Sequence, residues 1–436
     1  MTVALAGRAG TAWATSREPW ALLTDPQRAR EVLQQQLYGD LAVEGCEILQ
    51  TRFRTAPHER RRGAPIVGAA YRLTLRDGEQ LVHVRAYTGD GRRHYEKARA
   101  TARARPRFGP PLAYLPALDA VVWGFPNDPK LRHLADVVDP GVLWRHLPCG
   151  SDRVGVDVLR WKPGKRCVTR YRPAGAPAIV GKTVNHDGVA DIARRMEWMW
   201  RHAHDDADGF VVARPLGCSR AVKTAWQAAL PGIPLMQALM DGAEPGPLMR
   251  AAGAGLARLH AMAPADDLPH TTVADRLRFV HGGPLELAAA YPELRGRVEA
   301  LTALLEHVAA QLPPVPDRLV HGDFLLKQLV LSDGRLGVFD FDDFVLGDCV
   351  EDLGNCIADM HYWDLDPGAV RAMIADFLDA YRAHAAWDVP DDRLRWHCSV
   401  QLLRDAWYWH KRRQFEPAFR EELGALLARA EQPPVG

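Results

Sequence analysis

Apolar and polar residues alternate along several stretches of the first part of the chain, a pattern that predicts β-strands. Within 66–87, two alternating runs flank the pair Asp77-Gly78, which predicts a β-hairpin with its turn at that pair. A strand-like run at 46–55 precedes this hairpin. Helical spacing at 25–39 and a basic stretch at 92–104 predict one helix on each side of the strands.

A second block of alternating residues begins near Val154. It follows a proline-rich stretch at 105–119, which we interpret as a loop or linker. Three strand-like runs in this block are separated by turns at Pro163-Gly164 and near Ala174-Gly175. A helix and two more strands are expected next, at 188–203, 211–216 and 220–229. Both blocks have strands first and then a helix, so the first is a candidate for a degenerate copy of the second.

From Leu235 onward the spacing of apolar residues is mainly helical. One interruption, at 318–344, contains two strand-like runs around a turn at Asp333-Gly334. The whole pattern predicts a bilobal α+β protein, with a β-rich lobe followed by a helical lobe that contains a hairpin. The expected domains are an N-terminal cap domain, a β-rich N-lobe and a helical C-lobe, at 1–148, 149–232 and 233–436.

Composition narrows the class of protein. Apolar residues make up 47% and charged residues 25% of the 436 residues, as in ordinary globular proteins. A formal net charge of +1 weighs against a dedicated nucleic-acid binder. The arginine-rich stretch Arg92–Arg107 is therefore interpreted as a solvated helix face. Seven widely spaced cysteines without a CxxC pair indicate reduced thiols. Neither a signal peptide nor a membrane span is visible, so a cytoplasmic location without membrane or nucleic-acid partners is expected.

The interrupting segment carries the candidate chemistry. His321-Gly322-Asp323 is followed five positions later by Gln328, and twelve positions further by Asp340. Phosphoryl transfer needs a carboxylate that orients the attacking hydroxyl and oxygen ligands for Mg²⁺. Kinases hold these groups on one hairpin with this kind of spacing. We therefore predict Asp323 as the catalytic carboxylate, with Gln328 and Asp340 as metal ligands. His321 is expected to be structural.

With its neighbours, this segment closely resembles the aminoglycoside phosphotransferase family of small-molecule kinases. The resemblance rests on the HGD motif, the downstream amide and aspartate, and the later elements Gly347-Asp348 and Asp352-Leu353. Gly255–His260 matches the helix that precedes the catalytic loop in that family. The resemblance covers roughly 150–360 and implies a protein-kinase-like fold and the cofactors ATP and Mg²⁺. It also suggests Asp342 as a further metal contact, whereas Asp348 and Asp352 are expected to be structural.

The same resemblance implies a nucleotide site in the N-lobe. Lys182 stands at the end of the third strand and is expected to hold the α- and β-phosphates, with Glu197 as its partner on the next helix and Asp191 as the alternative. No glycine-rich phosphate loop is visible, and the turn Lys162–Lys165 occupies its place. The hinge that binds adenine is expected at Gln227, Ala229 and Leu230.

The acceptor remains open between alternatives. Gln328 replaces the asparagine of most family members, and maltokinase-like and glucosamine-kinase-like members share both this glutamine and an N-terminal cap domain. That likeness favours a sugar or amino sugar, and the HGD motif leaves an aminoglycoside as the alternative. A nucleotide-binding pseudokinase is the rival from another class. Aromatic and polar residues of the C-lobe suit sugar binding, and the candidates are Asp359, His361, Trp363, Trp407 and Trp409.

Overall fold

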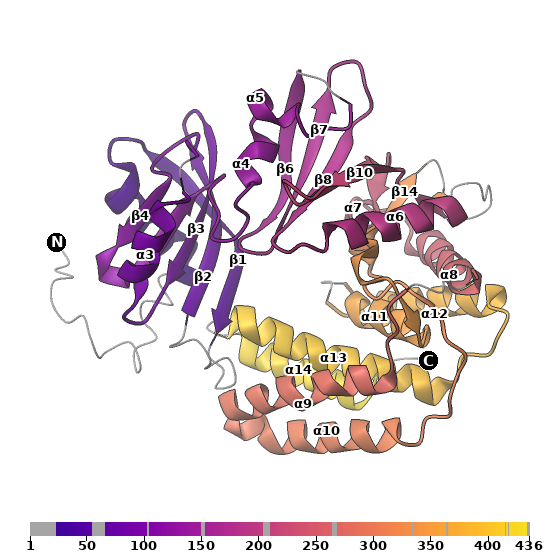
Figure 1. Ribbon diagram of the computed structural model, residues 1–436. Helices are drawn as coiled ribbons and strands as arrows, with labels where there is room; N and C mark the ends of the chain where they lie inside the picture. The colour runs from indigo at the N-terminus through magenta and orange to yellow at the C-terminus, as the bar shows by residue number, and fades with distance from the viewer. Residues whose placement is uncertain are drawn as a thin grey trace. The chain divides into compact units, whose positions relative to one another are not determined.

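The computed structural model describes residues 23–54, 66–102, 104–149, 153–203, 210–263, 268–332, 335–362, 365–414, 416 and 418–433. The chain divides into two compact units. Unit 1 consists of Met1–Ala190, Leu216–Trp226 and Lys411–Phe419, and unit 2 consists of Asp191–Pro215, Gln227–His410 and Arg420–Gly436. Figure 1 shows the β-rich N-terminal half and the helical C-terminal half of the chain.

Unit 1 begins with a five-stranded sheet in the order β1-β2-β3-β5-β4. Its strands are β1 (Val43–Arg54), β2 (Ile66–Leu75), β3 (Gly78–Ala86), β4 (Leu112–Leu115) and β5 (Ala120–Gly124). The accompanying helical segments are α2 (Pro26–Leu33), the π-helical turn η2 (Gln34–Tyr38), α3 (Gly91–Arg99) and the 3₁₀ turn η4 (Pro116–Leu118). The predicted hairpin is present, because β2 and β3 are antiparallel with Leu75 opposite Gly78.

Local chemistry explains the helix and the core of this sheet. Asp25 begins α2, and its Oδ1 accepts hydrogen bonds from the backbone N–H groups of Gln27 and Arg28, at 2.9 and 3.1 Å. Leu33 of α2 and Phe53 of β1 are buried in one core. Strand β4 was not expected, because its four residues are flanked by prolines and show no alternation of their own.

A second five-stranded sheet follows, in the order β10-β11-β8-β7-β6. Its strands are β6 (Val154–Lys162), β7 (Arg166–Pro173), β8 (Ile179–Val184), β10 (Pro215–Ser219) and β11 (Thr224–Ala228). Two short helices, α4 (Leu134–Val138) and α5 (Pro140–Leu143), precede it. Leu134 and Leu143 from these helices share a core with Trp161 and Tyr171 of the sheet.

The two sheets have the same strand order. Numbered along the chain within each sheet, the strands lie side by side as first, second, third, fifth and fourth. Along the chain, a helix separates the third strand from the fourth in both sheets. This helix is α3 in the first sheet and α6 (Val189–Ala203) in the second. This shared order is what a degenerate copy predicts.

Unit 2 contains the helical part of the chain. Its helices are α6, α7 (Leu235–Met240), α8 (Pro245–Ala261), α9 (Val273–Ala290), α10 (Arg295–Ala309), α11 (Val350–Met360), α12 (Pro367–His384), α13 (Asp391–Arg413) and α14 (Phe419–Glu431), with a 3₁₀ turn η5 (Pro292–Leu294). The ends of α6, α13 and α14 extend into unit 1. No helix among the described residues is long and apolar enough to cross a membrane.

Short strands of unit 2 form two small sheets. The first has the order β12-β14-β15-β9, with β9 (Val211–Val212), β12 (Ile233–Pro234), β14 (Leu329–Ser332) and β15 (Arg335–Val338). The second pairs β13 (Arg318–Val320) with β16 (Val345–Gly347). The predicted hairpin at 318–344 is thus the antiparallel pair β14–β15. In the sheet, β12 lies beside β14 and β9 lies beside β15. The expected turn of the hairpin, at 333–334, lies outside the described residues.

A small-residue helix allows close packing beneath these strands. A Cβ atom on Gly253 of α8 would lie 2.2 Å from the carbonyl oxygen of Phe377 on α12, so only glycine fits there. Leu256 of α8 and Ile374 of α12 are buried in the same core.

The seven cysteines are all free thiols, as the spacing predicted.

Candidate active site

The HGD motif forms a tight turn directly after β13. Gly322 has a φ of +79°, and a Cβ atom at this position would lie 2.5 Å from the backbone oxygen of Asp343. Only glycine tolerates both the left-handed backbone and this close approach. Since β13 pairs with β16, the turn that carries Asp323 is held against the segment that contains Asp340 and Asp342.

Asp352, at the start of α11, fixes the backbone of this turn. Its Oδ2 accepts the N–H of His321 at 2.6 Å, and its Oδ1 accepts the N–H of Gly322 at 2.9 Å. The side-chain amide of Asn355, one helical turn later, donates to the carbonyl oxygen of Gly322 at 3.3 Å. Asp352 is therefore a structural residue, as expected, and it orients the catalytic loop.

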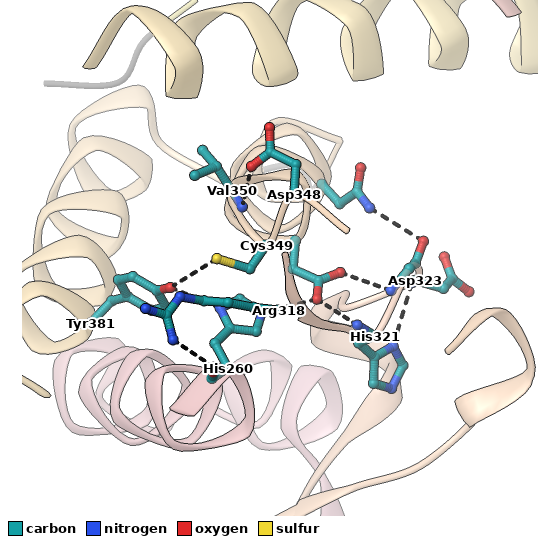
Figure 2. A network of polar contacts seen from close by, with 11 residues as sticks. His260, Arg318, His321, Asp323, Asp348, Cys349, Val350 and Tyr381 are labelled. Atoms are coloured by element: carbon teal, nitrogen blue, oxygen red, sulfur yellow. Dashed lines mark hydrogen bonds and ion pairs between the residues drawn. The ribbon is translucent and has the colours of Figure 1, made fainter. Parts of the chain in front are cut away.

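A buried histidine completes this support. His260 of α8 contacts Asp352 Oδ2 through Nε2 at 3.1 Å and the Tyr381 hydroxyl through Nδ1 at 2.7 Å. Burial alone lowers the pKa of His260, but the neighbouring Cys349 and the Asp352 carboxylate outweigh it and raise the pKa to about 9. Figure 2 shows His260, Tyr381 and Cys349 beside the turn that carries His321 and Asp323. His260 is accordingly a cation at neutral pH, paired with Asp352.

His321 is fully buried and has a structural role. Its Nε2 lies 3.2 Å from the backbone oxygen of Phe339, and its Nδ1 accepts the N–H of Asp323 at 3.4 Å. The carbonyl oxygen can only accept, so Nε2 carries the proton. The imidazole thus links the catalytic turn to the end of β15.

Gln328 joins the two predicted catalytic carboxylates. Its Nε2 donates to Asp323 Oδ2 at 3.0 Å and to Asp340 Oδ2 at 3.1 Å. The glutamine side chain is 4% exposed, whereas both aspartates are half-buried and open on one side. The structure therefore brings together the three residues that the spacing singled out.

The donor set fits a hard divalent cation. Asp340 has a left-handed backbone, with a φ of +71°, which turns the chain sharply after β15. Rotating the amide of Gln328 by half a turn presents its oxygen in place of its nitrogen, beside carboxylate oxygens of the kind that Mg²⁺ prefers. No cluster of three or more His, Cys, Asp or Glu side chains suited to a metal occurs in the described part of the chain.

Asp342 is held by a residue that the sequence did not single out. Its backbone oxygen accepts a hydrogen bond from the Arg195 guanidinium on α6. Arg195 thereby ties helix α6 to the loop of the metal ligands. No motif marks this arginine, because it belongs to the polar face of an ordinary amphipathic helix.

The predicted phosphate-binding pair occupies two different units. Lys182 is half-buried on β8 of unit 1, opposite Val168 of β7. Glu197 lies on α6 in unit 2, where its Oε1 is 3.0 Å from Nε of Arg201. Asp191, the alternative partner, is paired with Arg194 at 2.6 Å. The association of Lys182 with Glu197 stays a prediction.

The predicted hinge lies at the end of β11, the last strand of the second sheet along the chain. Gln227 lies in β11, and Ala229 and Leu230 follow that strand as half-buried residues. The preceding residue, Ala228, already donates its N–H to the carbonyl oxygen of Arg214 at 2.8 Å. Their role in binding adenine also stays a prediction.

The β6–β7 turn differs from a glycine-rich phosphate loop. The N–H of Gly164 donates to both carboxylate oxygens of Asp128, at 3.0 and 3.2 Å. Asp128 also accepts the indole N–H of Trp161 at 2.9 Å. Because the Gly164 amide is engaged in this way, it does not face a phosphate as a glycine-rich loop would, and a phosphate-binding role for this turn stays a prediction. Asp128 was not identified from the sequence, because it resembles any loop aspartate.

The predicted acceptor residues separate into two groups. Trp407 donates its indole N–H to Glu286 Oε2 at 2.6 Å and packs edge-on against Phe279 of α9, with 5.3 Å between the ring centroids. Trp409 instead lies 5.9 Å from the Tyr362 ring. The two tryptophans thus contact different parts of unit 2, as their spacing on α13 requires.

Asp359 and His361 lie at the end of α11, close to the catalytic loop. Asp359 is buried, and its Oδ2 accepts the N–H of Leu326 at 3.2 Å, two residues before Gln328. Burial, with a contribution from Arg429, lowers the pKa of His361 to about 4, so the ring is neutral. Trp363 lies outside the described residues.

Sequence reasoning missed Asp405 on α13, which belongs to the same neighbourhood. Burial raises the pKa of Asp405 to about 7, and the negative charge of Asp359 contributes in the same direction. Gln401 donates to Asp405 Oδ1 at 3.0 Å, while the Gln401 Oε1 atom and the Tyr362 hydroxyl have no hydrogen-bond partner among the described residues. The only available signal was helical spacing, because Asp405 precedes Trp409 by one turn.

Comparison with known proteins gives one family match. Residues 182–392 match the model of the phosphotransferase enzyme family, and this span contains the HGD turn and the predicted metal ligands. The predicted resemblance to the aminoglycoside phosphotransferases is thereby confirmed, and the helices and strands have the predicted α+β composition. The chain is a small-molecule phosphotransferase whose cofactors are ATP and a divalent metal ion.

Similar solved structures include three enzymes of this kind. An amicoumacin kinase in complex with AMP-PNP and Ca²⁺ has 16% identity and a TM-score of 0.49, over 64% of this chain and 89% of the kinase. A choline kinase from Cryptosporidium parvum Iowa II has 9% identity and a TM-score of 0.47, over 67% and 93%. A thermostable aminoglycoside phosphotransferase mutant with ADP and hygromycin B has 14% identity and a TM-score of 0.46, over 64% and 92%. Comparison with curated protein sequences gives no match.

Proposed function

We propose that this phosphotransferase transfers the γ-phosphoryl group of ATP to a hydroxyl of a sugar or amino sugar, with Asp323 as the catalytic carboxylate. The observation that carries the assignment of roles is the Gln328 amide, which contacts Asp323 at 3.0 Å and Asp340 at 3.1 Å. One side chain thus holds a half-buried base and a half-buried metal ligand in a single constellation. Such positioning is the main contribution that a protein makes to phosphoryl transfer.

In the proposed reaction, Asp323 accepts a hydrogen bond from the acceptor hydroxyl and aligns its oxygen with the γ-phosphorus. As the new oxygen–phosphorus bond forms, the bond to the β-phosphate oxygen breaks, and the hydroxyl proton passes to Asp323. Asp340 and, after rotation of its amide, Gln328 would hold a divalent cation, which would neutralise charge on the phosphates. Asp352 and His260 keep the HGD turn in place while the proton moves.

An acceptor with several hydrogen-bond donors suits the neighbourhood of Asp359. This region offers the carboxylates of Asp359 and Asp405, the Trp409–Tyr362 ring pair and a Gln401 oxygen that has no hydrogen-bond partner among the described residues. Hydroxyl groups satisfy such acceptors, and an ammonium group pairs with an ionised carboxylate. Among the sugars, these features favour an amino sugar. An aminoglycoside is the second candidate, because it carries the same groups.

The decisive experiment combines an acceptor panel with one substitution. ADP release is measured with sugars, amino sugars and aminoglycosides, and the best acceptor is then used with Asp323→Asn. We expect kcat to fall by about a thousandfold or more, since the base is lost while the shape is kept, and the Kd of ATP to change less than about threefold. Asp317→Asn, an exposed carboxylate that pairs with His270, is the matched control and should retain normal turnover. Near-normal turnover of Asp323→Asn would refute the catalytic role.

The panel itself decides the acceptor class. A kcat/KM for glucosamine-like acceptors well above that for neutral hexoses supports the amino sugar. A preference for aminoglycosides, together with reduced antibiotic susceptibility of a host that expresses the chain, would replace it with the second candidate.

A further inference from the structure

One face of the N-terminal sheet is hollow at its centre and polar at its edges. Strand pairing places a residue of β2 between one residue of β1 and one of β3 in two successive rows. These rows are Gln50–Ala70–His83 and Arg52–Gly68–Arg85. Because the central members are alanine and glycine, the longer side chains on both sides stand around a depression.

Three other segments of unit 1 cover this depression and form a cavity of about 200 Å³ with it. The cover consists of Lys130, the turn Pro163–Lys165 and Asn185. Hydrogen bonds hold the cover in place, because Gly164 donates its N–H to Asp128 at 3.0 Å and accepts from the Asn185 amide at 2.7 Å. The cavity is therefore preformed, and its volume suits a small metabolite.

The charge of the lining selects an anion. Arg52, Arg85, Lys130 and Lys165 all line the cavity, and its described lining contains no aspartate or glutamate. Four cations around so small a volume match a dianion better than a single carboxylate. Arginine also binds phosphate oxygens through two parallel N–H groups, and lysine adds a mobile point charge.

A buried histidine in the lining adds a hydrogen-bond acceptor. His83 is 5% exposed, and its Nδ1 lies 3.0 Å from the carbonyl oxygen of Ala69, so Nδ1 carries the proton. Its Nε2 has no partner among the described residues. Burial, reinforced by Arg85, lowers the pKa of His83 to about 3, and the ring stays neutral. A neutral nitrogen in this position can accept a hydrogen bond from a hydroxyl or N–H group of a ligand.

We propose that this cavity is a binding site for a small phosphate monoester that carries hydroxyl groups, such as a sugar phosphate. The phosphate contacts the arginines and lysines, and a ligand hydroxyl donates to Nε2 of His83. The site belongs to the N-terminal sheet and its cover, whereas the catalytic carboxylates belong to unit 2. It is a second site in addition to those for ATP and the acceptor, and it does not depend on which acceptor is phosphorylated.

Calorimetric titration of the full chain with glucose 6-phosphate tests the site. Saturating AMP-PNP and Mg²⁺ are present, so that the nucleotide site is already filled. Glucose and inorganic phosphate are titrated in parallel, because each offers only half of the proposed recognition. We expect glucose 6-phosphate to bind at one site per chain and more tightly than inorganic phosphate. Failure of both phosphate-containing probes to bind while AMP-PNP is present would overturn the proposal.

Variants locate the binding to this cavity. Arg85→Gln is expected to raise the Kd for glucose 6-phosphate at least about tenfold, because one arginine–phosphate contact is lost. Arg93→Gln, an exposed arginine on α3 outside the cavity, is the matched control and should stay within about twofold. His83→Phe should abolish the preference for glucose 6-phosphate over inorganic phosphate. An unchanged Kd in Arg85→Gln would show that the ligand binds elsewhere. This readout is independent of turnover, so it separates failure of the second site from failure of the proposed reaction.

Discussion

Gln328 shows how one residue can set the geometry of a catalytic pair. Its amide reaches both Asp323 and Asp340, and its burial in the 3₁₀ turn η6 (Leu326–Gln328) restricts its movement. Glutamine has one methylene more than the asparagine of most family members, so it spans a wider gap between the carboxylates. The spacing of these three residues in the sequence was sufficient to predict that they come together.

Gly322 is the position where the addition of a single carbon atom should most strongly reduce stability and activity. Gly322→Ala places a Cβ atom 2.5 Å from the Asp343 oxygen and forces a side chain into a φ of +79°. We expect a loss of about 2–4 kcal/mol in the free energy of unfolding, and a larger fall in kcat. Gly282→Ala, in the open interior of α9 with nothing within 4 Å, should instead stabilise the protein by about 0.5–1 kcal/mol. Urea denaturation of both variants checks this, and equal effects would contradict it.

We expect Asp405 to make acceptor binding sensitive to pH. Burial raises its pKa to about 7, so the side chain changes from a neutral acid to a carboxylate between pH 6 and 8. The KM of a cationic acceptor is expected to fall about fivefold or more over this interval, because the ionised fraction rises nearly tenfold. Asp405→Asn should have a higher KM without this pH dependence. A neutral sugar serves as the control acceptor, and an unaltered slope in the variant would exclude Asp405.

Asp405 and Asp128, in contrast, are residues whose contacts could not be predicted from the sequence. The catalytic residues were visible because a fixed spacing on one hairpin brings them together. Asp405 reaches the neighbourhood of Asp359 through the packing of α13, and Asp128 reaches Gly164 across 36 residues of chain. Such contacts depend on tertiary packing, which no local pattern encodes.

At the level of elements, two helices and a turn form one supporting unit. His260 belongs to α8 and Asp352 to α11, and their contact holds the backbone of the HGD turn that follows β13. The family-like stretch Gly255–His260 therefore acts through Asp352 and touches no reacting group. A change at the end of α8 is transmitted to Asp323 through two hydrogen bonds and the turn itself.

This arrangement predicts a stability that declines in mildly alkaline solution. The pKa of His260 rises from 6.5 to about 9 on folding, so the native state holds an extra proton between these values. The contribution of His260 to stability is complete below pH 6.5 and disappears as the pH rises through 9. We expect the free energy of unfolding to fall by roughly 1–3 kcal/mol over this window. His260→Gln should lack this component when urea midpoints are compared at pH 6, 7.5 and 9, and a parallel decline in the variant would disprove it.

Elements were predictable where periodicity was strong and were missed where strands are short. The hairpin of β2 and β3 followed from two long alternating runs around Asp77-Gly78. Strands β4, β13 and β16 have only three or four residues each, which is too short for alternation to be recognised. Their positions depend on pairing partners, and for β13 the partner lies beyond the catalytic turn.

At the scale of the whole molecule, the cores are separate. The core of the N-terminal sheet contains Phe53 and belongs to unit 1, whereas the large helical core contains Phe377 and belongs to unit 2. The α+β class and the order of β-rich and helical parts were predictable from periodicity. The inclusion of Lys411–Phe419 in unit 1 was not, because it depends on contacts such as that between Thr51 Oγ1 and the Arg412 oxygen, at 2.6 Å.

Separate cores predict two thermal transitions in differential scanning calorimetry. Phe53→Ala and Phe377→Ala each remove a fully buried ring, and each should cost about 3–5 kcal/mol. We expect each substitution to lower the transition temperature of its own unit and to leave the other within about 2 °C. A single transition that both variants shift equally would show that the units unfold as one.

The strand order shared by the two sheets has a consequence for synthesis on the ribosome. In each sheet the first three strands are consecutive neighbours, so most of their pairing joins residues close in sequence and needs little loop closure. The first sheet is complete once β5 has emerged, whereas the second must wait for β11 beyond α6. Nascent chains should therefore acquire protease resistance in two steps, and both precede the emergence of the catalytic turn.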